Sequence, residues 1–210
     1  DKKWGRYYFN HYNRYLLYFE RAGFEYDETM KSLSVCRKIK VDTKTSIRHV
    51  EDKMRDDLEL HSALFLILIK LGFEYMTNEI LPTVNRIMNR LDNTPIVEWE
   101  KLDINDRLNS LTKILNSKTS VPSELYNLFD RRDIIEHPTQ ERLYNMQDNN
   151  WKNNHLAWVL SGEIEDVFDS IVNFVNEQTI LFEKYVIDYP MPGKLLGVQR
   201  GIKAGEQFKK

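Results

Sequence analysis

An arginine and a histidine stand five residues apart in the segment Arg132-Asp133-Ile134-Ile135-Glu136-His137-Pro138. A guanidinium can hold two phosphate oxygens at once, and an imidazole can move a proton near neutral pH. The two residue types therefore suit the cleavage of a phosphodiester, and RNA is the substrate class that we expect.

The spacing by itself does not identify a site, because it occurs twice more in similar form. Arg6 and His11 have the same separation inside an aromatic-rich segment, and Arg55 and His61 have one extra residue between them. The surrounding elements therefore have to decide which pair carries chemistry.

The residues before Arg132 predict a helix that ends at His137. The run Ser120-Val121-Pro122-Ser123 can begin it, and Pro138 disfavours the α conformation for the residue that precedes a proline. A helix C-terminus favours a cationic imidazole, so His137 is expected toward its charged form. The side chains expected to face inward from this helix are Leu125, Leu128, Phe129 and Ile135.

Composition predicts an all-α protein of one domain, or of one domain with an appendage. Hydrophobic residues make up 41% of the 210 residues, with 8 glycines and 6 prolines, which favours helices over a turn-rich β protein. Asp103 or Asn105 can cap a helix whose apolar stripe is Leu108, Leu111, Ile114 and Leu115.

Other elements follow from hydrophobic periodicity and from proline and glycine. Helical spacing covers 3–22 with a stop at Gly23, whereas 24–45 alternates in a way that allows a short strand pair or an irregular segment. A long helix is expected over 46–81, with a boundary at Pro82 and a shorter helix over 83–91. The last long helix, 155–187, has as its core candidates Val167, Phe168, Ile171, Phe174, Val175, Ile180, Leu181 and Tyr185.

A formal charge of −2 and a pI near 6.3 exclude a protein that binds nucleic acid through overall positive charge. Any RNA contact must come from a local patch, for which Arg131, Arg142 and Lys152 are the nearest candidates. An ordinary solvated surface explains each of these charges equally well.

Several other classes of chemistry lack their sequence signals. One cysteine, Cys36, cannot form an internal disulfide or a cysteine-based zinc site, and this fits a reducing cytoplasm. The chain has no phosphate-binding glycine loop, no His-Glu-x-x-His pattern and no Gly-x-Ser-x-Gly turn. Residues 1–20 lack a secretory pattern, and the apolar run 62–69 is too short for a bilayer. We therefore expect a cytoplasmic protein without a membrane partner, metal or cofactor.

In the order of its helices the chain resembles the HEPN superfamily, helical-bundle proteins of prokaryotic toxin and defence systems with relatives in eukaryotes. The resemblance covers about 46–187 and rests on a long apolar helix leading into Phe73-Glu74-Tyr75-Met76-Thr77-Asn78-Glu79, then on Asp106-Arg107-Leu108-Asn109-Ser110-Leu111. It ends with an arginine, a polar residue, a histidine, a proline and one last long helix. The family's motif has four to six intervening residues, which Arg132 to His137 satisfies, and helix order disfavours the pairs at Arg6 and Arg55.

The resemblance implies a HEPN-like bundle of about four to five core helices over 46–189. The helical N-terminal appendage expected at 1–45 and the basic tail at 190–210 lie outside the resemblance. Catalytic members are metal-independent endoribonucleases that act as homodimers. By that resemblance Arg132 would hold the scissile phosphate, His137 would act as general base or acid, and Asp133 would orient the imidazole or remain a solvated residue. An antitoxin or regulatory protein would be a further partner.

Geometry supplies an independent argument for a dimer. Five residues on an ideal helix separate two side chains by about 140°, so Arg132 and His137 of one chain do not converge on one phosphate. A second chain could supply the convergence.

One feature departs from the family pattern. Toxins paired with a nucleotidyltransferase antitoxin usually have a tyrosine two places after the histidine, where this chain has Thr139. That pairing is disfavoured.

The alternative reading is a non-catalytic HEPN-like helical module that binds protein or nucleotide, in which Arg132 pairs with Asp130 or Glu136 and His137 caps its helix.

Overall fold

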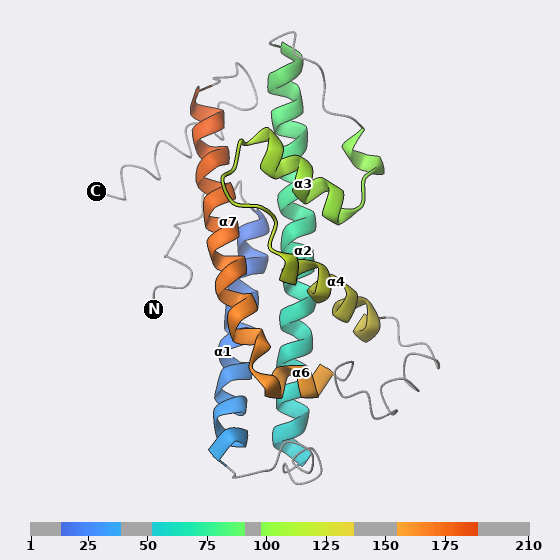
Figure 1. Cartoon of the computed structure of the whole chain (residues 1–210), viewed down its shortest axis with the longest axis vertical. Coiled ribbons are helices and arrows are strands. Elements are labelled where there is room, and N and C mark those ends of the chain that lie inside the picture. Colours follow the sequence, from blue (N-terminus) through green and yellow to red (C-terminus); the bar gives the residue numbers. More distant parts are fainter. Residues whose placement is uncertain (1–13, 39–51, 91–97, 137–154, 189–210) are drawn as a thin grey trace, which may run out of the picture. The chain divides into compact units, whose positions relative to one another are not determined.

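The computed structural model describes residues 14–38, 52–90, 98–136 and 155–188, and within these ranges the protein is all-α, without strands (Figure 1). The predicted all-α class is confirmed, whereas the HEPN-like details stay a prediction. The elements are α1 (Arg14–Lys38), α2 (Asp52–Arg90), the short 3-10 helix η2 (Trp99–Lys101), α3 (Ile104–Ile114), α4 (Ser123–Glu136), α6 (His155–Ser161) and α7 (Glu163–Asp188).

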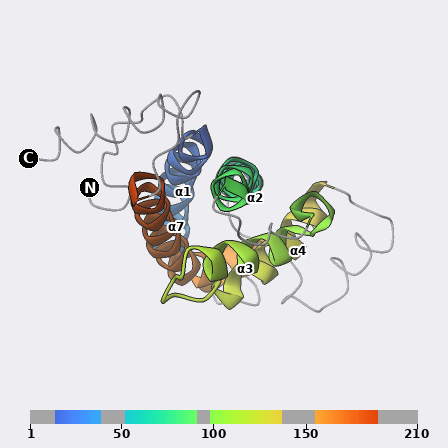
Figure 2. The same ribbon diagram turned by 90° about the horizontal axis from the view of Figure 1, so that it is seen from above.

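The described residues form two compact units. Unit 1 contains 14–18, 71–90, 98–122 and 171–188, and unit 2 contains 19–38, 52–70, 123–136 and 155–170. Each unit is built on one segment each of α1, α2 and α7, which lie side by side in both views (Figures 1 and 2). Unit 1 adds η2 and α3 to this base, and unit 2 adds α4 and α6.

Three aromatic rings join the three long helices in unit 2. Tyr26 of α1 stacks on Phe168 of α7 with ring centroids 3.8 Å apart, and Phe65 of α2 lies 5.9 Å from each of them. Phe65 and Phe168 are almost completely buried. Because aromatic side chains bury large areas and pack with specific geometry, this cluster fixes how the three helix segments meet.

The same three helices meet in unit 1 through different contacts. Tyr18 stacks on Tyr75 with centroids 4.6 Å apart, and Phe73 lies 6.0 Å from Phe174. The hydroxyls of Tyr15 and Thr179 are 3.3 Å apart, which pairs two buried polar groups between α1 and α7.

Helix α3 confirms the prediction made for it. Asp103 is the N-cap, its carboxylate accepting a hydrogen bond from the Asp106 amide at 2.9 Å, and Leu108 and Leu111 are fully buried. Arg107 holds this helix in place by donating to the Leu102 carbonyl at 2.8 Å and to the Asn78 side chain at 3.1 Å. The guanidinium therefore ties α3 to α2 within unit 1.

Helix α1 corrects the prediction for the first part of the chain. The expected stop at Gly23 is wrong, as is the expected strand pair or irregular segment, because the helix continues to Lys38. A buried stripe with alternating spacings of three and four residues explains the continuation: Phe19, Ala22, Tyr26, Thr29, Leu33 and Cys36. Burial also raises the pKa of the Cys36 thiol above its ordinary value.

The division into 1–45, 46–189 and 190–210 stays a prediction, since 1–13, 39–45 and 190–210 lie outside the described residues. What the structure shows of the first segment is a helix, α1, with buried residues in both units.

Pro82 does not end its helix, which corrects a second prediction. The expected helices 46–81 and 83–91 are one helix, α2, with the proline inside it. A proline lacks the amide hydrogen that would bond the carbonyl one turn earlier, so this helix loses one backbone bond, the one to the Asn78 carbonyl. The Thr83 hydroxyl donates to the neighbouring Glu79 carbonyl at 2.8 Å. Buried Leu81 and Val84 on either side hold the helix against the core of unit 1.

Gly162 divides the helix that was expected to run from 155 to 187. Its φ of 89° lies in the left-handed region, so α6 ends before it and α7 begins after it. The predicted core positions Val167, Phe168, Ile171, Phe174 and Val175 are buried, but Ile180 is 52% exposed, so its assignment to the core is wrong.

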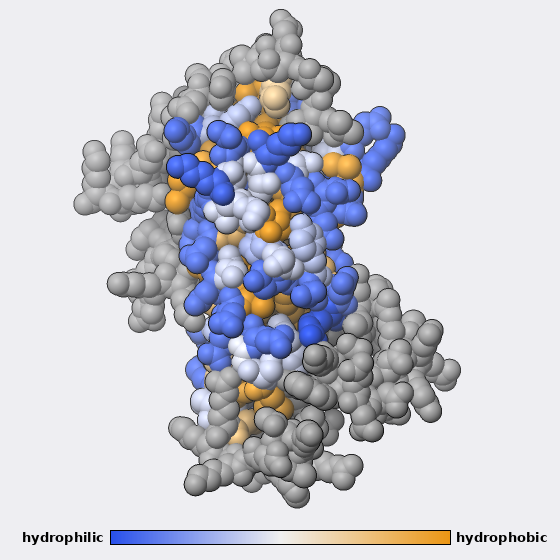
Figure 3. Space-filling view, viewed as in Figure 1, coloured by the Kyte–Doolittle hydropathy of each residue, from blue (hydrophilic) through white to orange (hydrophobic). Residues whose placement is uncertain are grey.

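The face shown in Figure 3 is mainly hydrophilic over the described residues, with apolar residues in small separate spots. Among the described residues, one helix segment, Asp56–Asn85, is apolar enough and long enough to cross a membrane, and 44% of its most apolar part is buried. Core helices of soluble proteins meet the same criterion, and residues such as Phe65 and Phe73 pack against α7 within their own units. The cytoplasmic location stays a prediction.

Glu79 makes the stability of unit 1 depend on pH. Burial raises the pKa of this carboxyl to about 7, although the Arg14 backbone amide and charge oppose the rise. A carboxyl whose pKa is higher in the folded state than in the unfolded state weakens folding as pH rises from about 4.5 to 7. We expect Glu79→Gln to raise the thermal midpoint at pH 8 and to change it much less at pH 4.5. An equal gain at both pH values would contradict this.

The backbone at Gly162 provides a second prediction. An alanine would place a Cβ in a left-handed conformation, so Gly162→Ala should lower the free energy of unfolding by about 1–2 kcal/mol. Urea denaturation measures this difference. The matched control is Asn116→Gly at the other described positive φ, 51°, where the change should leave stability equal or higher. Unchanged stability of the Gly162 variant would disprove the strain argument.

Candidate functional site

Helix α4 carries the residues singled out by sequence, and it forms where the sequence indicates. It begins at Ser123, directly after Pro122, and it is described through Glu136. Leu125, Leu128 and Phe129 are buried as predicted, which orients the helix against unit 2. The side chain of Ile135 lies outside the described part.

The predicted catalytic residues are covered only in part. Arg132 is half-buried on the last turns of α4, and Asp133 lies on the same helix with its side chain outside the described part. His137 follows the last described residue of α4 and is itself outside, as are Arg142 and Lys152. The convergence of Arg132 of one chain with His137 of a second chain therefore stays a prediction.

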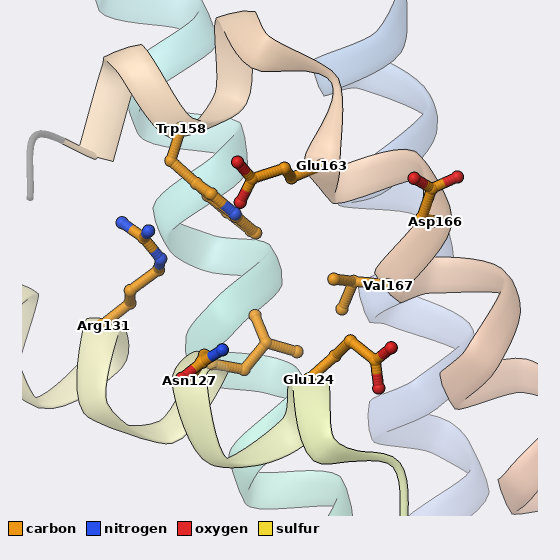
Figure 4. A pocket seen from close by; sticks show the side chains of 8 residues that line it. Glu124, Asn127, Arg131, Trp158, Glu163, Asp166 and Val167 are labelled. Carbon is orange, nitrogen blue, oxygen red and sulfur yellow. The ribbon is translucent and has the colours of Figure 1, made fainter. Parts of the chain in front are cut away.

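Arg131, the neighbour of Arg132, has a well-defined environment. Its guanidinium carbon lies 5.0 Å from the centre of the Trp158 ring, a cation–π contact between α4 and α6 (Figure 4). Burial lowers the pKa of Arg131 from its ordinary value, and the carboxylate of Glu163 partly offsets this effect. The arginine thus contacts an indole and feels the charge of a nearby acid.

A cavity of about 210 Å³ opens beside this contact, within unit 2. Three helices form it, as Figure 4 shows: α4, α6 and the start of α7. Its polar residues are one arginine, one asparagine and three acids, and its apolar wall is the indole with two aliphatic side chains. The lining residues are Glu124, Asn127, Leu128, Arg131, Trp158, Glu163, Asp166 and Val167.

The three acids come from helix N-termini. Glu124 is in the first turn of α4, and Glu163 and Asp166 are in the first turn of α7. Carboxylates are favoured there by the helix dipole, so each acid has a local reason for its place. The break at Gly162 creates the second of these N-termini. Sequence reasoning missed the cavity because it expected one continuous helix, although Gly162 followed by three acids is the sequence pattern of a helix start.

The buried His155 lies next to Trp158, and the centroids of the two rings are 5.9 Å apart. Its Nε2 is 2.7 Å from the Ser62 hydroxyl oxygen, and that hydroxyl is 2.6 Å from the Leu58 carbonyl. Since the single hydroxyl hydrogen goes to the carbonyl, we assign the imidazole proton to Nε2, which donates to Ser62. The Nδ1 atom then has a bare lone pair, and it has no hydrogen-bond partner among the described residues.

The charge state of His155 follows from this environment. Burial first, and the positive charge of Arg131 second, lower the pKa of His155 to about 4. The imidazole is therefore neutral at physiological pH. It positions Ser62 and Trp158 within the core of unit 2 and is not placed to exchange protons with solvent.

In the pair Arg55 and His61, the histidine has a structural role. His61 Nδ1 lies 2.7 Å from a carboxylate oxygen of Glu25, and Arg21 lies 2.6 Å from the other oxygen. The Glu25 side chain is 1% exposed, so two partners hold a buried carboxylate between α1 and α2. Among the described residues, no group of three or more metal-binding side chains could hold a metal ion.

No protein-family model, no curated protein and no solved structure matches this chain.

His155 gives a testable pH dependence of stability. A histidine whose pKa falls on folding leaves the folded state unprotonated while the unfolded state takes up a proton, so stability is lost as pH falls from about 6.5 to 4. For a group this deeply buried the loss is on the order of 3 kcal/mol. His155→Gln keeps a donor for Ser62 and cannot titrate, so its unfolding free energy should fall less over this range.

Chemical denaturation at several pH values measures the effect. Glu79→Gln in unit 1 is the matched control, because it removes a dependence of opposite sign over a similar range. Parallel acid profiles for the parent protein and His155→Gln would show that His155 is not the group responsible.

Proposed function

We propose that the protein is a metal-independent endoribonuclease of toxin or defence type, which cuts RNA at a site formed by Arg132 and His137 in a homodimer. The observation that carries the proposal is the course of α4. Because the helix continues through Glu136, Arg132 lies on its last turns and His137 is the next residue of the chain. An imidazole following a helix C-terminus is favoured in its cationic form, which suits a proton donor.

The chemistry assigns one role to each residue. Arg132 would bind the non-bridging oxygens of the scissile phosphate and stabilise the charge that develops on them. The ribose 2′ oxygen then attacks phosphorus and loses its proton, while the 5′ oxygen leaves and gains one. His137 would serve one of these two proton transfers, and the same residue of the partner subunit would serve the other. Asp133 would orient the imidazole.

A specific observation favours the alternative, a non-catalytic helical module that binds protein or nucleotide. Arg131 was one of three cations expected to contact RNA, and it lies in a cavity with Glu124, Glu163 and Asp166. Carboxylates beside a guanidinium repel a phosphate, so this arginine is poorly placed to hold an RNA backbone. The RNA contacts of the proposed enzyme therefore depend on Arg132, Arg142 and Lys152.

Cleavage of a mixed RNA pool in the presence of EDTA tests the proposal. Arg132→Ala and His137→Ala should each reduce the rate by at least about 100-fold, because each removes a group that acts in the transition state. Circular dichroism and size-exclusion chromatography check that fold and oligomeric state are kept. Lys113→Ala, at an exposed lysine of α3, controls for the loss of a positive charge, and His61→Gln controls for the loss of a histidine.

The two functions predict different outcomes. A nuclease gives cleavage that resists EDTA and is lost in both variants, but not in the controls. Absence of cleavage by the parent protein, or equal cleavage by all variants, would transfer the assignment to the binding module.

A further inference from the structure

Unit 2 leaves three large hydrophobic side chains exposed to solvent among its described residues. They are Phe24 and Val35 on α1, which are 48% and 43% exposed, and Leu60 on α2, which is 55% exposed. Single exposed apolar residues are normal on a protein surface, but a contiguous apolar patch marks a contact surface. The directions of these side chains therefore decide whether they form a patch.

On α2 the exposed leucine belongs to an apolar stripe. Leu60, Leu64 and Ile67 lie within about 60° of one another around the helix, because each residue advances it by about 100°. Leu64 and Ile67 are partly exposed, whereas Phe65 and Ile69 on the opposite side are completely buried. The outward side of a surface helix is normally polar, so this segment of α2 is apolar on a side that the core does not cover.

The exposed side chains of α1 point in the same direction. Phe24 and Val35 lie within about 20° of each other around their helix. Glu25 and His61 join the two helices at 2.7 Å, and α1 and α2 run in opposite directions (Figure 1). In an antiparallel pair, the residues that precede the two members of a contact lie on the same side of it, and these are Phe24 and Leu60. The two helices thus share one apolar surface, the α1–α2 face: Phe24, Val35, Leu60, Leu64 and Ile67.

The spacing on α2 fits a second helix. Leu60, Leu64 and Ile67 are separated by four and then three residues, the spacing with which helices interdigitate in a coiled coil. Ala63, at the edge of the stripe, has a small side chain and lets another helix approach closely. A helix packed along α2 would remove the stripe from water.

The charges beside the stripe favour a second copy of the same helix. Asp56 and Lys70 lie at equal distances before and after Ala63, on the same edge of the stripe. In a parallel pair each would meet its own kind, but in an antiparallel pair centred on Ala63 each Asp56 lies opposite Lys70 of the partner subunit. Lys70 also interacts within its own chain, so this pairing sets the orientation of the helices and is not what holds them together.

We propose that the α1–α2 face is a homodimer interface, in which the α2 helices of two copies pack antiparallel about Ala63. Leu60 of each copy packs on Leu64 of the partner subunit, and Phe24 and Val35 extend the contact along α1. The ribonuclease proposal requires a homodimer without naming its surface. This inference rests on that homodimer and adds the surface that forms it.

Sedimentation equilibrium of the full chain tests the surface. The parent protein should be a dimer, and Leu60→Glu should raise its dissociation constant at least about tenfold, because a charge enters the apolar centre of the interface. The matched control is Ile180→Glu, at a similarly exposed apolar residue of α7 that lies in unit 1 and outside the face; it should leave the constant unchanged. Circular dichroism checks that both variants keep their helices.

A charge exchange tests the orientation at positions where folding is not at risk. Asp56→Lys and Lys70→Glu should each weaken the dimer, since each places like charges opposite one another. The double variant should regain the affinity of the parent protein, because every pair is then attractive again with its signs reversed. A parallel pair would gain nothing from the second change.

Each of the other outcomes overturns the inference. A parent dimer that is unaffected by Leu60→Glu uses another surface, and a double variant without recovery is not antiparallel about Ala63. Both results leave the ribonuclease proposal standing. A parent protein that stays monomeric at the highest concentration reached overturns the inference and removes the homodimer from the proposed function as well. A dimer that follows every expectation but cuts no RNA supports the interface and contradicts only the nuclease.

Discussion

The contact among Tyr26, Phe65 and Phe168 is the constraint on which the rest of unit 2 depends. It fixes the approach of α1, α2 and α7, and the polar pairs lie within one turn of it: Glu25 precedes Tyr26, and His61 and Ser62 precede Phe65. A buried carboxylate is tolerable only where its partners arrive at hydrogen-bonding distance. The aromatic packing supplies that accuracy for Glu25 with His61, and on another side of α2 for Ser62 with His155.

Sequence predicted the fold best where local signals and packing agreed. Helix α3 has a capping aspartate and one apolar stripe, and α4 begins after a proline, so both were found. Helix α1 was cut short because Gly23 is a typical helix stop and the segment after it alternates, although Gly23 is itself buried and the buried stripe continues through Thr29 and Leu33. Pro82 misled in the same way, since a proline boundary is a local rule and the buried neighbours on both sides outweigh it.

The candidate site divides along the same line. Residue type and order were enough to single out Arg132 and His137, because a short motif can be identified without knowledge of contacts. The structure places Arg132 on the last turns of α4. The surroundings of Arg131 could not be predicted from sequence, because the indole and the acids come from segments far apart in the chain. A cation counted as available for RNA is in fact engaged by Trp158 and lies near Glu163. The positions of three helices must be known before one can say whether such a positive charge is available to a ligand.

Cys36 lies near the end of α1, almost fully buried, with a thiol whose pKa is raised by burial. Thiol reagents attack the thiolate in contact with solvent, so the folded protein offers them very little to attack. Modification has to wait for a local opening that separates α1 from its neighbours in unit 2. Because Cys36 is the chain's single cysteine, the rate of its alkylation measures that opening, and no label has to be introduced.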